Sequence, residues 1–358
     1  MNTYGTGKAV RRPTRHRHRS SLAVLLVLAA LCMAAVLLAQ GDERSDRRES
    51  SKAEALLWRD PGNIAARNLF YGSGGRAGEP HGPYVFLEED PTGTTPKFDI
   101  RDGDGVRWTV KLGIEAQPET AAARLVWAVG YLTTEDYFVP ELRVANMPPR
   151  LHRGQNLIAP DGAMHNVRLK RHDPHAKKIG RWRWSDNPFV RTRELNGLRV
   201  MMALINNWDL KDENNSIYEV QSAPGSAAPI DLYMVSDLGA SFGSTGRSWP
   251  ARKSKGNLES YRGSTFIREV TPDYVDLNVP TRPAVAYAVA PREFSQRLHL
   301  RWIGKQIPRS DVRWVAHLLA QLSPDQIRAA FRAAGYPPGE VEGFTRVVLQ
   351  RIAQLNKL

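Results

Sequence analysis

Residues 208–215 are Trp-Asp-Leu-Lys-Asp-Glu-Asn-Asn, and they place a carboxylate, an ammonium group and an amide at short, fixed intervals: Asp209, Lys211 and Asn214. A second polar run, Ser-Asp-Leu-Gly at residues 236–239, ends an apolar stretch. Acids and amides at such spacing are the oxygen ligands that Mg²⁺ takes in proteins. The two runs together predict a polar site around Asp209, Asn214 and Asp237.

The segment between the two runs explains how they can meet. Residues 216–220 and 230–235 are strand-like, and a loop rich in Ser, Ala, Pro and Gly separates them at 222–229. A hairpin over these residues would carry Asn214 and Asp237 to neighbouring positions at its open end. Residues 191–206, with apolar side chains at helical spacing, predict a helix that ends just before Trp208.

The preceding region alternates between strand and helix signals. Residues 84–88, 97–101 and 107–112 are strand-like, with the tight-turn sequence Asp-Gly-Asp-Gly at 102–105. Residues 118–129 predict a helix, and 137–144 and 167–171 could complete a sheet. Lys111 closes the third strand, while Glu119, eight residues later, and its competitor Glu115 lie near the start of the helix. Helices are further predicted over 312–322, 324–334 and 340–355, with 240–310 irregular.

The chain resembles the protein-kinase-like superfamily, as an atypical bacterial, membrane-anchored branch. Asp209, Lys211 and Asn214 have the Asp-x-Lys-x-x-Asn spacing of a kinase catalytic loop, and Asp237-x-Gly239 resembles the magnesium-binding turn. The resemblance implies an α+β, bilobal kinase-like fold. An antiparallel-sheet N-lobe would span residues 81–172, and a mainly helical C-lobe residues 173–358.

The resemblance also implies a role for each site residue. Asp209 would be the base that orients the acceptor, and Lys211 would neutralise the moving phosphate. Asn214 and Asp237 would hold Mg²⁺, and ATP would be the second cofactor. The remaining residues implied to bind the nucleotide are Lys111, Glu119, Thr92, Gly93 and Thr94.

The chain departs from the kinase pattern at several positions. Asn207 and Trp208 replace the usual His-Arg, and Leu238 replaces the phenylalanine of Asp-Phe-Gly. No Gly-x-Gly-x-x-Gly is present, so the loop over the phosphates would have to be residues 92–95. The expected activity is transfer of the ATP γ-phosphate to an unidentified acceptor. A catalytically weak pseudokinase or envelope-tethered interaction module stays an alternative, as does a metal-assisted hydrolase built on Asp209, Asp212 and Asp237.

The N-terminal region predicts a membrane anchor. Residues 1–20 form a basic tail without acids, and 21–39 form an apolar segment just long enough to cross a bilayer as a helix. Residues 40–80 are expected to be a juxtamembrane linker with one short helix at 52–58. The soluble part is expected outside the cytoplasm, or secreted if the segment is a cleaved signal peptide.

The net charge of +13 overstates the basic character of the soluble part. The tail carries six of these charges, which leaves +7 for the remaining residues, a balance suited to anionic substrates such as nucleotides. A basic and aromatic run from Lys170 to Trp184 could bind an acidic polymer, although a solvated loop is the favoured interpretation, and nucleic acid is not an expected partner. Cys32, the single cysteine, lies in the apolar segment, so no disulfide-linked partner is expected.

Overall fold

The computed structural model describes residues 54–91, 93, 95–221, 229–244, 254–279, 295 and 298–358. Glu54–Leu358 forms one compact unit. The basic tail and the apolar segment predicted to span the membrane lie outside the described residues, so the anchor stays a prediction. No helix among the described residues is both long and apolar enough to cross a bilayer.

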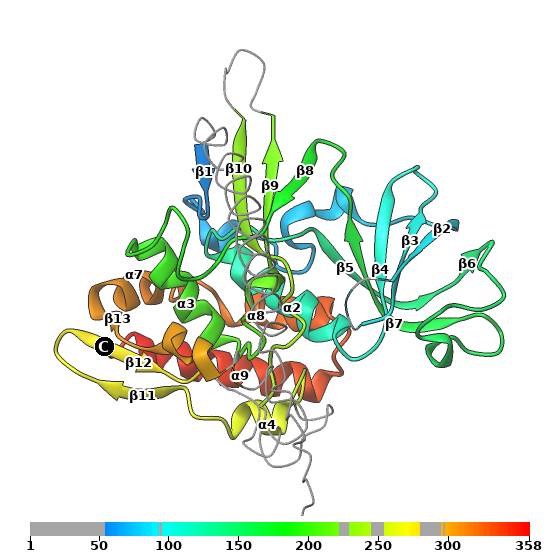
Figure 1. The fold of residues 1–358 in the computed structure, drawn as a ribbon. Helices are drawn as coiled ribbons and strands as arrows, with labels where there is room; N and C mark the ends of the chain where they lie inside the picture. The colour runs from blue at the N-terminus through cyan, green and yellow to red at the C-terminus, as the bar shows by residue number, and fades with distance from the viewer. Residues whose placement is uncertain are drawn as a thin grey trace, which may run out of the picture. The chain divides into compact units, whose positions relative to one another are not determined.

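A six-stranded sheet forms the first half of this unit (Figure 1), with the strand order β5-β7-β4-β3-β2-β6. All neighbouring strands are antiparallel except β2 and β6. The strands are β2 (Tyr84–Asp90), β3 (Lys97–Arg101), β4 (Arg107–Lys111), β5 (Asp136–Leu142), β6 (Val144–Ala145) and β7 (Met164–Arg171). The five strands predicted for this region are therefore present.

The two faces of this sheet differ because side chains alternate along a strand. Phe98, Ile100, Trp108 and Val110 are fully buried in a hydrophobic cluster on one face. The residues between them, at 97, 99, 107, 109 and 111, place charged and polar groups on the other face. A polar sheet face is the setting of the candidate site.

Helix α2 (Ala116–Ala128) connects β4 to β5, close to the predicted bounds. Its apolar residues join the second and larger hydrophobic cluster, to which the helices that follow it in the chain also contribute. Helix α2 thereby links the sheet to the helical part. The described residues thus contain two hydrophobic cores.

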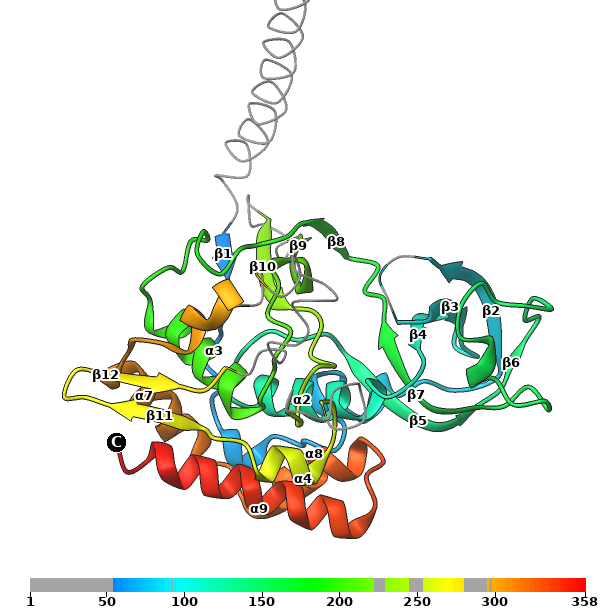
Figure 2. The ribbon, with the colours of Figure 1, turned by 60° about the horizontal axis from the view of Figure 1, so that its bottom comes forward.

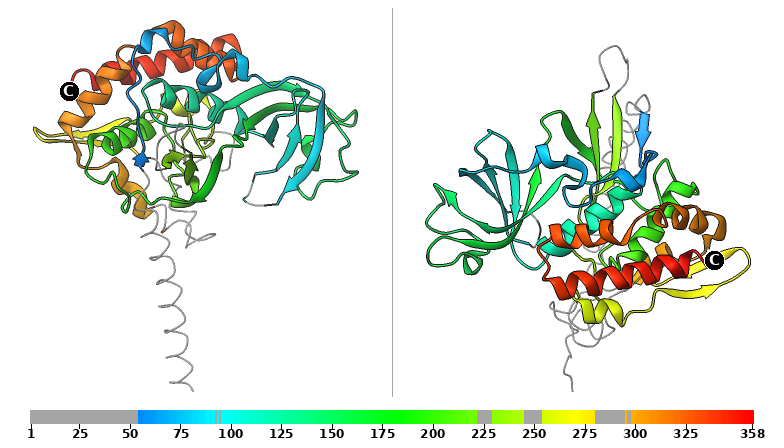
Figure 3. Two further views of the ribbon diagram at one scale, coloured as in Figure 1. Left: turned by 90° about the horizontal axis from the view of Figure 1, so that it is seen from above. Right: turned by 180° about the vertical axis from the view of Figure 1, so that it is seen from behind.

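The helical part surrounds the larger core. Its helices are α3 (Arg193–Leu204), α4 (Leu258–Arg262), α7 (Arg309–Leu319), α8 (Pro324–Ala333) and α9 (Pro338–Leu355). Figures 2 and 3 show α8 and α9 lying side by side. Ser323 caps α8 in a reciprocal capping box with Gln326, as its position before Pro324 suggests. A small sheet of β11 (Ile267–Val270), β12 (Tyr274–Leu277) and β13 (Ile307–Pro308) lies in the region predicted to be irregular.

A four-stranded sheet differs most from the predictions. It has the order β1-β10-β9-β8, in which β9 (Asn215–Val220) and β10 (Ile230–Val235) form the predicted hairpin. Residues predicted as a helix and a solvated loop form the edge strands β1 (Glu54–Leu56) and β8 (Ala176–Gly180), because the hairpin offers both of its edges for pairing.

The expected linker also ends earlier than residue 80. Leu57, Ile64 and Leu69 are almost fully buried in the larger core, so their burial fixes this segment to the compact unit. Short 3-10 helices occur at Ile64–Ala66, Gly72–Gly74, Arg76–Gly78, Gln155–Leu157, Asp212–Asn214 and Leu300–Gly304.

Candidate functional site

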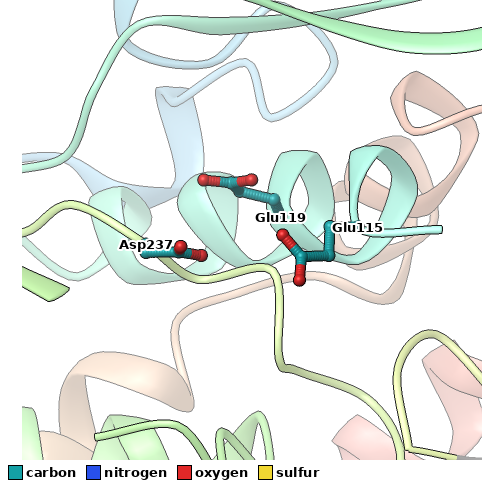
Figure 4. Close-up of side chains that lie close together, drawn as sticks. All are labelled: Glu115, Glu119 and Asp237. Carbon is teal, nitrogen blue, oxygen red and sulfur yellow. The ribbon is translucent and has the colours of Figure 1, made fainter. Parts of the chain in front are cut away.

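Lys111 lies at the centre of three carboxylates. Its Nζ atom is 2.8 Å from Glu119 Oε2, 2.7 Å from Glu115 Oε2 and 3.3 Å from Asp237 Oδ1. Only 6% of the Lys111 side chain is exposed. Figure 4 shows the carboxylate of Glu119 on α2, that of Glu115 just before this helix, and that of Asp237 on the segment alongside. The predicted pairing of Lys111 with Glu119 is confirmed, and Glu115 pairs with the same ammonium group.

Local structure explains why these groups meet. Lys111 ends β4 on the polar face of the sheet, in register with Lys97 on β3 and Arg168 on β7. Glu115 and Glu119 are four residues apart at the start of α2, so their side chains lie on one face of the helix. Carboxylates in a first helical turn also compensate the helix dipole.

The cluster keeps Lys111 charged. Burial lowers the pKa of Lys111, but the nearby carboxylates of Glu119, Asp237 and Glu115 outweigh burial and raise this pKa above its ordinary value. Glu115 is likewise held ionised: burial raises its pKa, and the ammonium groups of Lys111 and Lys255 lower it further than burial raises it.

Arg168 is a second buried cation at the site. It lies 3.5 Å from Glu119 Oε2 and 2.9 Å from Asp136 Oδ1. Burial still raises the pKa of Glu119, against the opposing effects of Arg168 and Lys111. Buried charges need such partners, since an unpaired charge costs far more than a paired one.

Asp237 is the most accessible of the three carboxylates. Its side chain is 41% exposed, whereas those of Glu115 and Glu119 are 11% and 2% exposed. Its Oδ1 accepts a hydrogen bond from the main-chain nitrogen of Gly239 at 3.1 Å, which fixes the turn. A side chain at Gly239 would place its Cβ atom 2.8 Å from the Cβ atom of Glu115, so only glycine allows this approach of the turn to α2.

The loop that carries Asp209 lies beside this turn. The main-chain nitrogen of Trp208 donates to the oxygen of Ala240 at 3.3 Å, and that of Ser236 donates to the oxygen of Asn214 at 2.8 Å. The hairpin register, with Val235 opposite Asn215, produces this arrangement. The predicted approach of Asn214 to the Asp237 turn is confirmed.

Within the loop, the side chains of Asp209, Lys211 and Asn214 are held close together. Lys211 Nζ is 3.8 Å from Asp209 Oδ1, and each side chain is about one-quarter exposed. The Nδ2 atom of Asn214 donates to the main-chain oxygen of Asp209 at 2.6 Å, which turns its amide oxygen the other way. Asn207 Oδ1 accepts from the Asp209 main-chain nitrogen at 3.0 Å and fixes the start of the loop.

Of the predicted phosphate-covering loop, residues 92–95, the structure describes residues 93 and 95. Thr92 and Thr94 lie outside the described residues, so their predicted role stays a prediction. Gly93 has a left-handed backbone with φ 72°, and its main-chain oxygen accepts a hydrogen bond from Arg153. The Oγ1 atom of Thr95 donates to Glu115 at 3.0 Å, so the end of this loop reaches the cluster.

The donor atoms at the site fit Mg²⁺. The exposed carboxylate of Asp237 and the amide oxygen of Asn214 are hard oxygen ligands of the kind that this ion prefers. Glu115, Glu119 and Asp237 form the acidic group found among the described residues, but it is already paired with Lys111, Lys255 and Arg168.

The trio required by the hydrolase alternative is not assembled in the described residues. Asp209 and Asp212 do not join the acidic group around Lys111. Asp212 instead accepts a hydrogen bond from the main-chain nitrogen of Trp184 at 3.2 Å.

Lys255 and Arg168 belong to the site but were not predicted. Lys255 pairs with Glu115, and its Nζ atom lies 5.6 Å from the centre of the Trp208 ring. It therefore links the carboxylates around Lys111 to the loop that carries Asp209. No sequence motif marks Lys255, because its partner is far away in the chain. Arg168 could have been found, since it alternates with Lys170 on a strand predicted to join the same sheet.

The similarity of this chain to known proteins is slight. No protein-family model and no curated protein matches the chain. Among solved structures, the proinflammatory kinase CtkA of Helicobacter pylori matches 76% of this chain and 96% of its own, at 11% identity and a TM-score of 0.42. A likeness this slight assigns neither an activity nor site residues to this chain.

Proposed function

We propose that this chain is an atypical, kinase-like phosphotransferase that uses ATP and Mg²⁺. The observation that carries the proposal is the contact of one buried ammonium group with a helix glutamate and a turn aspartate. Lys111 Nζ lies 2.8 Å from Glu119 and 3.3 Å from Asp237. Phosphoryl transfer needs a lysine fixed in this way to hold the nucleotide phosphates, beside a carboxylate that binds the metal.

In this proposal the residues divide the work between charge neutralisation and alignment. Asp237 and Asn214 would hold Mg²⁺, which when bound would neutralise charge on the phosphates. Lys111 would bind the nucleotide phosphates, with Glu119 as its positioning residue. Asp209 would orient the acceptor hydroxyl and accept its proton, and Lys211 would stabilise the charge on the transferred group.

The residues that stand in place of the kinase His-Arg pair make hydrogen bonds of their own. Asn207 fixes the Asp209 main chain, and the Nε1 atom of Trp208 donates to the main-chain oxygen of Ser254 at 2.8 Å. These two bonds support a preorganised Asp209 loop in the absence of His-Arg. Preorganisation of the acceptor-binding group is what alignment requires.

Substitution of Asp237 by alanine tests the activity. The Asp237→Ala variant is expected to lower kcat for ATP turnover about 100-fold or more, because a metal ligand acts on the charge that develops during transfer. Asp212→Ala is the matched control, since Asp212 bonds to Trp184 outside the cluster. Turnover that survives Asp237→Ala at the wild-type rate contradicts the proposal.

A pseudokinase or interaction module remains the second candidate, and one observation favours it. Lys111 is already saturated by three carboxylates, so incoming phosphates must displace at least one of them. A binding module would show no ATP turnover in the wild type under conditions where the chain is folded. The same turnover assay therefore separates the two candidates.

We further propose that residues 21–39 anchor the chain in a membrane, with the soluble part outside the cytoplasm. The apolar run and the basic tail before it support this arrangement. A reporter that works only in the cytoplasm, fused after Leu358, is expected to be inactive. Activity of this reporter would contradict the orientation. The supply of ATP on the outer side then becomes a requirement of the proposed activity.

A further inference from the structure

Basic side chains from two sheets converge beside the candidate site. Lys97 on β3 is in register with Lys111, so the two side chains share one face of the six-stranded sheet. Lys170 on β7 lies on the same face, two residues further along the strand, opposite Thr109. The four-stranded sheet contributes Lys178 on β8, and Arg181 follows directly after that strand.

Tyr218 connects the two sets. It is in register with Lys178 across β8 and β9, so the two side chains share a face. The Nζ atom of Lys170 lies 3.3 Å from the Tyr218 hydroxyl and 5.7 Å from the centre of its ring. Lys97, Lys170, Lys178 and Arg181, together with Tyr218, are hereafter the basic cluster.

The cations of the basic cluster are close enough to repel one another. Burial lowers the pKa of Lys178, and the charges of Lys170, Arg181 and Lys97 lower it further, against an opposing effect of Tyr218. Lys97 has a carboxylate partner in Asp90 at 2.7 Å. Lys170, Lys178 and Arg181 form no ion pair with any carboxylate in the described part of the chain.

The loop between β9 and β10 contains no acidic residue either. Residues 222–228 contain only Ser, Ala, Pro and Gly. Cations that converge without a counter-charge destabilise the free protein, and such repulsion is relieved when an anion binds between them. A compact, multiply charged anion satisfies several lysine and arginine donors at once, as phosphate groups do.

We propose that the basic cluster is a binding site for a phosphate-bearing ligand, separate from the magnesium ligands Asn214 and Asp237. The affinity of the basic cluster for an anion does not depend on phosphoryl transfer, so this proposal goes beyond the proposed function. The anion would bridge the six-stranded and four-stranded sheets through Lys170 and Lys178. The phosphate can come from the far end of a bound nucleotide or from a second ligand.

Titration calorimetry with inorganic tripolyphosphate in EDTA tests the basic cluster in the full chain. Binding at the proposed magnesium site requires the metal, whereas binding at the basic cluster does not. Lys178→Ala and Lys170→Ala are each expected to weaken the affinity about tenfold, the effect of one charged hydrogen bond. Lys178→Arg should retain most of the affinity, because the positive charge is conserved.

Lys177→Ala is the matched control. Lys177 adjoins Lys178 on β8, is in register with Glu219 and lies on the opposite face of the strand. Its loss should leave tripolyphosphate binding unchanged. No binding in the absence of Mg²⁺, or an equal loss of affinity in Lys177→Ala, overturns the proposal.

A second measurement uses stability instead of binding. If the cluster is held together against repulsion, Lys178→Met should raise the melting temperature at low salt. About 0.5 M NaCl shortens the Debye length to roughly 4 Å and should remove this difference. A lower melting temperature for Lys178→Met at low salt overturns the idea of unrelieved repulsion. Tripolyphosphate binding is also measured in the presence of saturating ATP and Mg²⁺. If ATP and Mg²⁺ block it, the site belongs to the nucleotide phosphates. If both bind at the same time, the site belongs to another phosphate-bearing ligand.

Discussion

At the scale of single residues, the charge balance around Lys111 controls the candidate site. Three carboxylates contact its ammonium group, but Glu115 and Glu119 each have a further cation, in Lys255 and Arg168. Asp237 has Lys111 alone among the ion pairs of the described residues. Loss of the Lys111 charge therefore affects stability as well as ligand binding.

Lys111→Met is expected to lower the free energy of unfolding by about 3 kcal/mol, because it leaves buried carboxylates without their shared partner. The double variant Lys111→Met/Glu119→Gln should recover part of this loss, since the most buried carboxylate is then neutral. Urea denaturation at pH 7 measures both values. A single variant as stable as the wild type would show that the cluster does not depend on Lys111.

Asp99 gives a pH-dependent prediction. Burial raises its pKa, but the neighbouring His172, Thr109 and Arg107 outweigh burial and lower the pKa from 3.8 to about 2. A lowered folded-state pKa stabilises the fold above pH 3.8, and this contribution is lost as the pH falls toward 2. Asp99→Asn should thus cost about 2 kcal/mol at pH 7.

Urea denaturation of both proteins between pH 2 and 7 checks this sign. The difference in the free energy of unfolding between wild type and Asp99→Asn should shrink below pH 3.8, where Asp99 takes up its proton in the unfolded chain but not yet in the folded protein. A difference that stays constant across the range would mean that the ionisation of Asp99 does not contribute.

The sequence allowed part of this site to be predicted, for physical reasons. The pairing of Lys111 with Glu119 is local, because a strand end leads directly into a helix start. The approach of Asn214 to Asp237 follows from one hairpin. Lys255 could not be predicted, because its contact with Glu115 depends on how distant segments pack.

At the scale of elements, α3 positions the loop that carries Asp209. Gly197 on α3 faces Tyr131 and Trp314, and an added Cβ atom would lie 2.6 Å from Trp314 Cζ3. The Tyr131 hydroxyl donates to the main-chain oxygen of Glu194 at 2.7 Å, so this packing also holds the start of the helix. The close approach of these elements requires a residue without a side chain.

Gly197→Ala is expected to destabilise the protein by about 1–3 kcal/mol through overpacking. Gly339 on α9 is the matched control, since an added Cβ atom there would meet nothing within 4 Å. Gly339→Ala should raise stability by about 0.5 kcal/mol, because alanine favours a helix. Thermal denaturation measures both; equal effects of the two changes would contradict the packing argument.

Elements with strong internal periodicity were predicted well, and edge elements were not. Helix α3, with apolar side chains at helical spacing, and the alternating β3 and β4 follow from their own side chains. Strands β1 and β8 are short, and they exist because the β9–β10 hairpin has edges to pair with. Short segments that depend on a distant partner carry little signal of their own.

At the scale of the whole compact unit, a polar sheet face and a helical core meet through α2. Its apolar side joins the larger core, and its N-terminal end presents Glu115, the residue just before the helix, and Glu119 to Lys111 on the sheet. Two members of the basic cluster, Lys97 and Lys170, lie on the same polar face as Lys111. Binding of a nucleotide would therefore affect contacts in both the sheet and the helical part.

Thermal denaturation with ATP and Mg²⁺ tests the central claim most directly. Saturating ligand is expected to raise the melting temperature of the wild type by several degrees, as any ligand specific for the folded state does. Asn214→Ala and Asp237→Ala should abolish the shift, whereas Asp212→Ala should keep it. A wild-type melting temperature unchanged by ATP and Mg²⁺, or a shift that persists in Asp237→Ala, would contradict the account.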